Sequence, residues 1–157
     1  SRFVGDLAMP TDKAQSSVTT PSSTVLVVDD NKDAVDIVAR LLSHNGIAAL
    51  RAYSGQECLD LVRSHSVDVM VLDVMMPGMD GLEVCKHLKE LPSPPPVILL
   101  TAKDDMATRS SGMSLGVSEF MVKPVNNRDL IARIKTQLST LQWERDIDKT
   151  SEIIEPS

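Results

Sequence analysis

Short apolar runs alternate along this chain with longer stretches in which apolar residues recur at helical spacing. The run at residues 67–73 is rich in valine and leucine, and it ends in Asp73 just before a turn containing Pro77 and Gly78. A short apolar run of this kind is typical of a strand buried on both faces. Proline lacks a backbone donor and glycine accepts unusual φ angles, so the chain should leave the sheet here. Asp73 is therefore expected at the carboxyl end of a central strand, where open α/β sheets bind ligands.

Four more apolar runs have the composition of buried strands, at residues 24–28, 47–52, 97–100 and 118–122. The stretches between the runs predict helices at 31–45, from Ser54 to about residue 64, at 81–90, at 103–115, and from Asn126 or Asn127 to Trp143. Polar N-caps such as Asn31 and Ser54 support these starts, and Asn45-Gly46 is a typical helix end. The helix at 103–115 is only weakly amphipathic, so we expect it to be short or mobile.

Regular alternation of strands and helices predicts a parallel sheet with helices on both faces. Because crossovers are right-handed, few windings are open to such a chain. We therefore predict an α/β fold, a flavodoxin-like doubly wound sheet of five parallel strands in the order 2-1-3-4-5. Its switch point lies between the first and third strands, which end in Asp29-Asp30 and Asp73.

The 157 residues suffice for one domain with extensions. Residues 1–23 are rich in Ser, Thr and Pro and predict a flexible N-terminal arm or linker, and residues 24–143 form the domain. Residues 144–157 are expected to be a C-terminal tail or a linker to a missing output region. The apolar stripe of the last helix breaks at Arg145, which favours packing on the core over a long coiled coil.

Composition narrows the classes of partner. The net charge of −6 argues against direct nucleic-acid binding by this chain, because phosphate binding needs a basic face. No apolar run reaches the ~18 residues of a membrane span, so no membrane association is expected. Cys58 and Cys85 lie in separate helical patterns without metal-ligand spacing. They predict buried core thiols in a reducing compartment and a cytoplasmic location.

Polar residues stand at the ends of four predicted strands: Asp29-Asp30, Asp73, Thr101 and Lys123. Three carboxylates at one edge repel each other unless a cation neutralises them, and Mg²⁺ prefers such oxygen ligands. A lysine and a hydroxyl beside them make a site suited to a phosphoryl group, whose transfer depends on positioning and charge compensation. An aspartate can accept that group as an acyl phosphate.

Each of these residues also has a simpler interpretation. Asp29 or Asp30 could be a helix cap, Thr101 an ordinary strand end, and Lys123 an exposed lysine. Their joint occurrence at one edge favours the functional interpretation.

Residues 24–141 resemble the response-regulator receiver domain of two-component signalling. The resemblance rests on the paired acids after the first strand, D-x-M-M-P-G-M-D-G after the third, T-A after the fourth and F-x-x-K-P on the fifth. It implies that Asp73 is the phosphoacceptor for a histidine kinase, a phosphotransfer protein or a small phosphodonor. The chain would then be a phosphoacceptor domain and not an enzyme, with at most self-phosphorylation and slow self-dephosphorylation.

The same resemblance implies a metal site. Asp30 and Asp73 would bind Mg²⁺ directly, together with the backbone carbonyl of Met75, and Asp29 would act through water. Mn²⁺ is a plausible substitute for Mg²⁺ in such a site.

The resemblance also implies the parts of a switch. Lys123 would pair with the acids and then with the phosphoryl group, Thr101 would bond to that group, and Ala102 would leave room for its entry. Phe120 stands at the family's aromatic switch position, although it could equally be a core residue. The Lys123–Pro124 peptide bond is expected to be cis.

The resemblance further implies that two residues near the site influence the lifetime of the acyl phosphate. Met75 and Lys103 follow Asp73 and Thr101 by two positions. Neither offers a carboxylate or an amide to orient an attacking water, so slow self-dephosphorylation is predicted.

Other functions fit less well. A haloacid-dehalogenase-like phosphatase would need a second aspartate at the position of Met75, and a nucleotide-binding module would need a glycine-rich loop where residues 29–33 are acidic. A degenerate receiver that binds or dimerises without phosphorylation stays open as an alternative. His44, His65 and His87 are interpreted as solvated and not as phosphodonors. The output domain or partner is unknown, and a homodimer could form through residues 103–115, 118–122 and the last helix.

Overall fold

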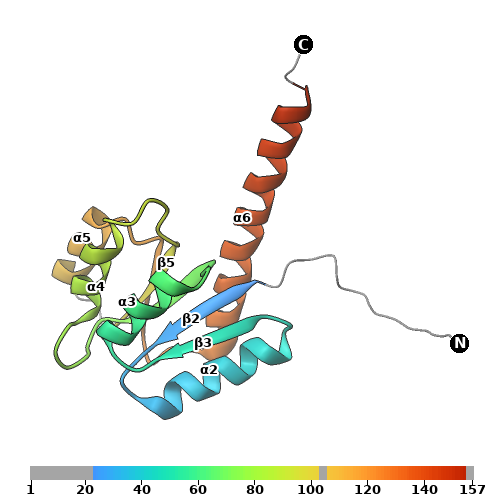
Figure 1. Cartoon of the computed structure of the whole chain (residues 1–157). Helices are drawn as coiled ribbons and strands as arrows, with labels where there is room; N and C mark the ends of the chain where they lie inside the picture. The colour runs from blue at the N-terminus through green and yellow to red at the C-terminus, as the bar shows by residue number, and fades with distance from the viewer. Residues whose placement is uncertain (1–22, 103–105, 155–157) are drawn as a thin grey trace, which may run out of the picture.

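The computed structural model describes residues 23–102 and 106–154, and the side chains of 23–102 and 107–141. Within these residues strands and helices alternate (Figure 1). The strands are β2 (Thr24–Val28), β3 (Ala48–Ala52), β4 (Val69–Asp73), β5 (Val97–Ala102) and β6 (Glu119–Lys123). The helices are α2 (Lys32–His44), α3 (Gly55–Ser64), α4 (Gly81–Leu88), α5 (Met106–Ser114) and α6 (Asn127–Ile154).

The five strands form one parallel sheet in the order β3-β2-β4-β5-β6. This is the predicted 2-1-3-4-5 order, so the fold prediction is confirmed. The register pairs Val28 with Leu72 and Asp73 with Leu100, so β2, β4 and β5 end nearly level with one another. The carboxyl ends of these three strands therefore meet at one edge.

Alternate residues of each strand enter two separate cores, because successive strand side chains point to opposite faces. Leu26, Met70 and Leu72 pack with α3 and α4 on one face. Val25, Val71 and their like-facing neighbours pack with α2 and α6 on the other. Figure 1 shows α3, α4 and α5 on one side of the sheet and α2 and α6 on the other, which confirms the predicted layers.

Most observed boundaries differ from the predicted ones by a few residues, but α6 is helical to Ile154 and not to Trp143. β4 begins at Val69 and not at residue 67, although the Asp68 amide donates to the Thr24 carbonyl and the Asp68 carboxylate accepts from the Thr24 amide, each at 2.8 Å. α4 ends at Leu88 before the proline-rich segment. Asn126 is the cap of α6, since its side chain accepts from the amides at 128 and 129.

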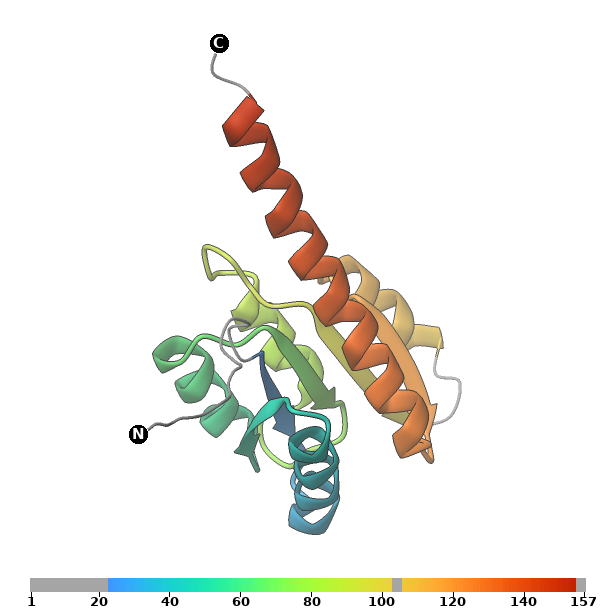
Figure 2. The same ribbon diagram turned by 90° about the vertical axis from the view of Figure 1, so that its right-hand side faces the viewer.

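The last helix packs on the sheet through its first half. Leu130, Ile131 and Ile134 are buried, and Leu138 and Leu141 pack against the same core, which confirms the core-facing interpretation. The helical backbone then continues to Ile154 and extends away from the domain (Figures 1 and 2). The division at residues 23 and 143 stays a prediction, and residues 1–22 and 155–157 lie outside those described.

Both thiols are buried as expected. Cys58 is 0% exposed and Cys85 is 3% exposed, and both are free. Burial raises the pKa of each thiol to about 12. Cys58 Sγ lies 3.6 Å from Met70 Sδ, so it serves as an apolar core group. Among the described residues no helix is long and apolar enough to cross a membrane.

Gly81 allows α4 to start directly against the end of β4. A Cβ atom at this position would lie 2.6 Å from the Asp73 carbonyl oxygen and 2.8 Å from Val74 Cα. The Gly81 amide also donates to the Val74 carbonyl at 2.9 Å. Because both neighbouring atoms belong to the backbone, an alanine here would have to move the chain that carries Asp73.

We predict that Gly81→Ala lowers the free energy of unfolding by about 1–3 kcal/mol, the range typical of overpacking. Urea denaturation measures this change. Lys86→Ala, at an exposed position of the same helix, serves as the control. Equal stability of the two variants would show that the close approach at Gly81 is not constraining.

Candidate functional site

The first acid pair lies where β2 ends. Asp29 is 7% exposed, its amide donates to the Ala52 carbonyl at 3.2 Å, and its carboxylate accepts from the Asn31 amide at 3.0 Å. These bonds fix the buried carboxylate above the end of the sheet. Asp30, the next residue, is exposed to solvent. The pair therefore provides one enclosed and one open carboxylate.

Asp73 is the last residue of β4, at the centre of the sheet, and is 2% exposed. The Met75 amide lies 3.3 Å from Asp73 Oδ1 and donates to it. The Val74 amide donates to the Leu100 carbonyl at 3.0 Å, which ties the chain after Asp73 to β5. The strand and its loop thus hold the carboxylate at the predicted place.

The three acids form one cluster. Carboxylate oxygens of Asp29, Asp30 and Asp73 all lie within 4.8 Å of one another. Burial raises the pKa of Asp29, and the nearby charge of Asp73 raises it further, while the Asn31 amide and Lys123 oppose the shift. Carboxylates that repel one another when they are all ionised are suited to bind a divalent cation such as Mg²⁺, which prefers hard oxygen donors. The donor set therefore fits the predicted metal.

Lys123 reaches this cluster from the end of β6. Its Nζ lies 2.9 Å from Asp73 Oδ2 and 3.8 Å from Asp29 Oδ2. The side chain is 37% exposed, so it bridges the acids and the solvent. The Lys123–Pro124 peptide bond is cis, as expected. Lys123 is therefore not an ordinary exposed lysine but the cation that partly neutralises the site.

Thr101 and Ala102 lie on β5 at the same edge. Thr101 is 1% exposed and follows Leu100, the register partner of Asp73, while Ala102 is exposed and pairs with Lys123. The register places both residues between the strand of Asp73 and the strand of Lys123. Lys103 lies outside the described residues.

A cavity of about 520 Å³ opens over the acids. Its lining joins Asp29, Asp30, Asp73 and Lys123 to an apolar side formed by residues of α2 and of the segment after β6. The cavity does not include Thr101 or Ala102 among its lining residues. The lining also includes Ile37 of α2, which is 48% exposed and was not predicted as a site residue. The signal was present, because Ile37 is an apolar residue outside the buried stripe of α2.

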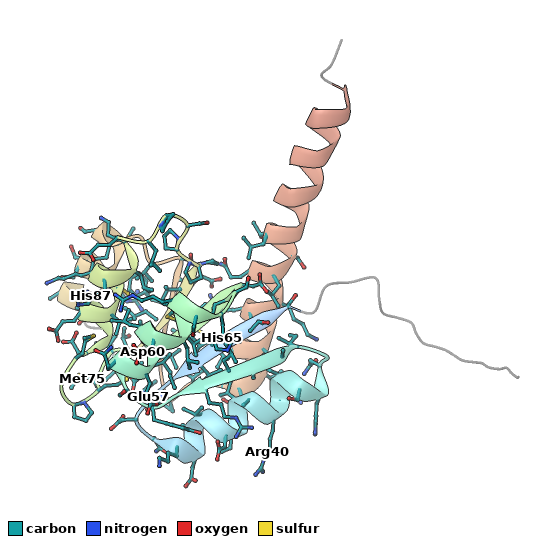
Figure 3. The ribbon with its side chains drawn as sticks, in the orientation of Figure 1. Arg40, Glu57, Asp60, His65, Met75 and His87 are labelled. Carbon is teal, nitrogen blue, oxygen red and sulfur yellow. The ribbon has the colours of Figure 1, made fainter. Side chains whose placement is uncertain are left out.

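The remaining predicted residues lie around the site. Met75 is 68% exposed in the loop between β4 and α4 (Figure 3). Phe120 is half-buried on β6 and packs against the core. His44 and His65 are exposed and His87 is half-buried, and these histidines do not line the cavity. Figure 3 labels His65 and His87.

The pKa of Asp29 predicts a pH dependence of stability. With a raised pKa the folded state binds more protons than the unfolded state just above pH 3.8, so the free energy of unfolding falls as pH rises through that window. Asp29→Asn keeps an oxygen for the Asn31 amide but removes the charge. We expect this variant to be more stable than the wild type at pH 7 in the presence of EDTA, with the difference shrinking towards pH 3.

Thermal unfolding at several pH values measures this difference. Asp60→Asn, which neutralises an exposed acid on α3, should show no such trend. A variant at position 29 less stable than the wild type at pH 7 would contradict the prediction.

Comparison with known proteins gives a consistent result. The family model for the response regulator receiver domain matches residues 25–135. Response regulator MprA of Mycobacterium avium is 37% identical over 127 residues, which cover 81% of this chain and 56% of that protein. The chain thus spans about half the length of the curated relatives it matches.

Solved structures agree with this match. The receiver domain of the Francisella response regulator 1452 has a TM-score of 0.72 and 32% identity, over 76% of this chain and 99% of that one. Response regulator DrrB, a Thermotoga maritima OmpR/PhoB homologue, has a TM-score of 0.69 and 31% identity, over 76% of this chain and 54% of that one. The family match, together with the fold and the acids at the strand ends, shows that the chain belongs to the response-regulator receiver domain family of two-component systems.

Proposed function

We propose that this domain is a phosphorylation-dependent switch in which Asp73 accepts a phosphoryl group from a histidine kinase, a phosphotransfer protein or a small phosphodonor. One observation carries the proposal: the nearly buried Asp73 carboxylate is paired with Lys123 at 2.9 Å within a cluster of three acids. A structural ion pair alone would not need the two further carboxylates. Burying carboxylates close together costs free energy. That cost is explained if the site functions in a reaction that brings further charged groups to it.

The transfer uses few groups. An Asp73 carboxylate oxygen attacks phosphorus as the bond from phosphorus to the donor's nitrogen or oxygen breaks, and the donor keeps that electron pair. Lys123 moves from the Asp73 carboxylate to a phosphoryl oxygen, because the negative charge has moved there. The Met75 amide, 3.3 Å from Asp73 Oδ1, is placed to donate to the aspartyl group. Thr101 would donate its hydroxyl to the phosphoryl group, and Ala102 leaves room for its entry.

The acids are suited to hold the metal. Asp30, Asp73 and the Met75 carbonyl would bind Mg²⁺, with Asp29 acting through water, and Mn²⁺ would be accepted by the same oxygens. When bound, the ion would neutralise the carboxylates and the charge that develops on the phosphoryl oxygens. A degenerate receiver would have no need of this complete acid and lysine set, so the phosphorylated form of the proposal is preferred.

Phosphorylation would act on the face formed by α5, β6 and α6. The new phosphoryl group adds negative charge and acceptor oxygens, which draw the Thr101 hydroxyl towards Asp73. Phe120 could then rotate and α5 could shift with it. That face would control an output domain or a protein partner, and a homodimer through it is one form of such control. The cognate kinase would dock at the opening of the cavity to reach Asp73.

We predict a single phosphoryl adduct on incubation with a small phosphodonor and Mg²⁺, measured by intact mass. Asp73→Asn should abolish the adduct, because an amide oxygen is a poor nucleophile, and EDTA should suppress it. Asp60→Asn, an exposed acid outside the cavity, is the matched control and should be labelled like the wild type. Absence of any adduct with either a small donor or a kinase would favour a degenerate receiver.

We also predict slow loss of the phosphoryl group. Met75 is 68% exposed beside Asp73 and offers no group that orients water for attack on the acyl phosphate. Phosphorylated wild type should therefore keep its label for minutes or longer in Mg²⁺ buffer, followed by intact mass. Met75→Asn adds an amide at this place and should shorten the lifetime several-fold. Loss of the wild-type label within seconds would refute this prediction.

A further inference from the structure

The ring of Phe120 lies beneath α5, against a helix position that has no side chain. A Cβ atom at Gly112 would lie 2.8 Å from both Cε1 and Cζ of the Phe120 ring, and 3.4 Å from Leu99 Cδ2. Packed carbon atoms prefer separations of about 3.5–4.0 Å. The ring therefore occupies the space that any larger residue at position 112 would need.

A second residue of α5 holds the same ring. The guanidinium carbon of Arg109 lies 6.0 Å from the Phe120 ring centroid, within the range of a cation–π contact. Arg109 precedes Gly112 by three residues, so both lie on the same face of the helix. We call Arg109, Gly112 and Phe120 the Phe120 clamp.

The Phe120 clamp connects α5 to the strands of the phosphoacceptor site. Phe120 pairs with Leu99, two residues before Thr101, and it precedes Lys123 by three residues on β6. Over residues 107–114 of α5 the buried positions are Thr108 and Gly112. A helix with so little burial is readily displaced, and the contact with the Phe120 ring is one of those that hold it in place.

We propose that Gly112 sets the position of the switch in the unphosphorylated state. Because Gly112 has no side chain, the Phe120 ring can occupy the space beneath α5. The proposal rests on the proposed function of Asp73. With alanine at position 112, the ring must rotate away or α5 must move, and these are the changes that phosphorylation is proposed to cause. If the donor reacts with the shifted conformation, a larger population of that conformation in Gly112→Ala should also make Asp73 faster to phosphorylate.

The ring can be observed directly by ¹⁹F NMR. The chain contains two phenylalanines, Phe3 and Phe120, so fluorophenylalanine labelling gives two resonances that Phe120→Leu assigns. We expect phosphodonor and Mg²⁺ to move the Phe120 resonance of the wild type. In unphosphorylated Gly112→Ala that resonance should already be displaced in the same direction. Its rate of phosphorylation by the small donor, measured by intact mass, should rise several-fold.

Two controls separate the ring from helix propensity. Ser111→Ala, at the exposed neighbouring position, gains helix propensity without facing the ring and should leave the resonance and the rate unchanged. The double variant Phe120→Leu/Gly112→Ala should lose most of the rate gain, because the colliding ring atoms are gone. A rate gain that persists in the double variant would overturn the proposal.

Other results are equally decisive. An unchanged resonance in Gly112→Ala would overturn the proposal, and a lower phosphorylation rate would overturn the assignment of this ring position to the resting state. If Gly112→Ala fails to fold, Arg109→Met tests the cation–π contact of the Phe120 clamp. This variant should displace the Phe120 resonance in the same direction as phosphorylation, and no displacement would overturn the proposal. If the wild type takes up no phosphoryl group, the proposed function fails, whereas the resonance still reports whether Gly112 seats the ring.

Discussion

Electrostatic repulsion among carboxylates at the carboxyl edge of the sheet is the constraint on which this site depends. The parallel register brings Asp29 and Asp73 together at the ends of neighbouring strands, and Asp30 follows Asp29. Burial raises the pKa of Asp29, so the arrangement disfavours its own ionised form. Lys123, 2.9 Å from Asp73, offsets part of this repulsion, and the proposed Mg²⁺ would offset the remainder.

The fold and the cluster could be predicted from sequence because one geometric rule connects them. Parallel strands end at a common edge, so polar residues that follow separate apolar runs must meet there. Asp29, Asp73 and Lys123 are distant in the chain, yet each follows a strand and each is found where expected. Boundaries were less certain: β4 begins at Val69 although the apolar run starts at Val67, because a strand end depends on pairing with neighbouring strands and not on the pattern alone. The cis bond at Lys123–Pro124 was expected only from the family resemblance.

Contacts between elements could not be derived in this way. Nothing in the spacing of α5 indicates that Gly112 faces the Phe120 ring, because this contact depends on how closely the helix approaches β6. Arg109 likewise looks like a solvated charge in the sequence, and its place over the ring follows from tertiary packing. Ile37 stands out in the sequence as an apolar residue outside the buried stripe of α2, but the pattern does not place it at the cavity. The contacts of Gly112 and Arg109 with Phe120 depend on how α5 packs against β6.

The unequal anchoring of the helices explains where a charge change at Asp73 can have an effect. α2 and α4 each place several buried side chains in the two cores, and the first half of α6 does the same. Moving any of these helices would expose apolar surface, at ~25 cal/mol per Å². α5 buries far less, and its Gly112 lies against the ring of Phe120, which is on the same strand as Lys123. The proposed change in the position of Lys123 or Thr101 would therefore act first on the helix that is least costly to move, which is why we propose α5 as the output of the site.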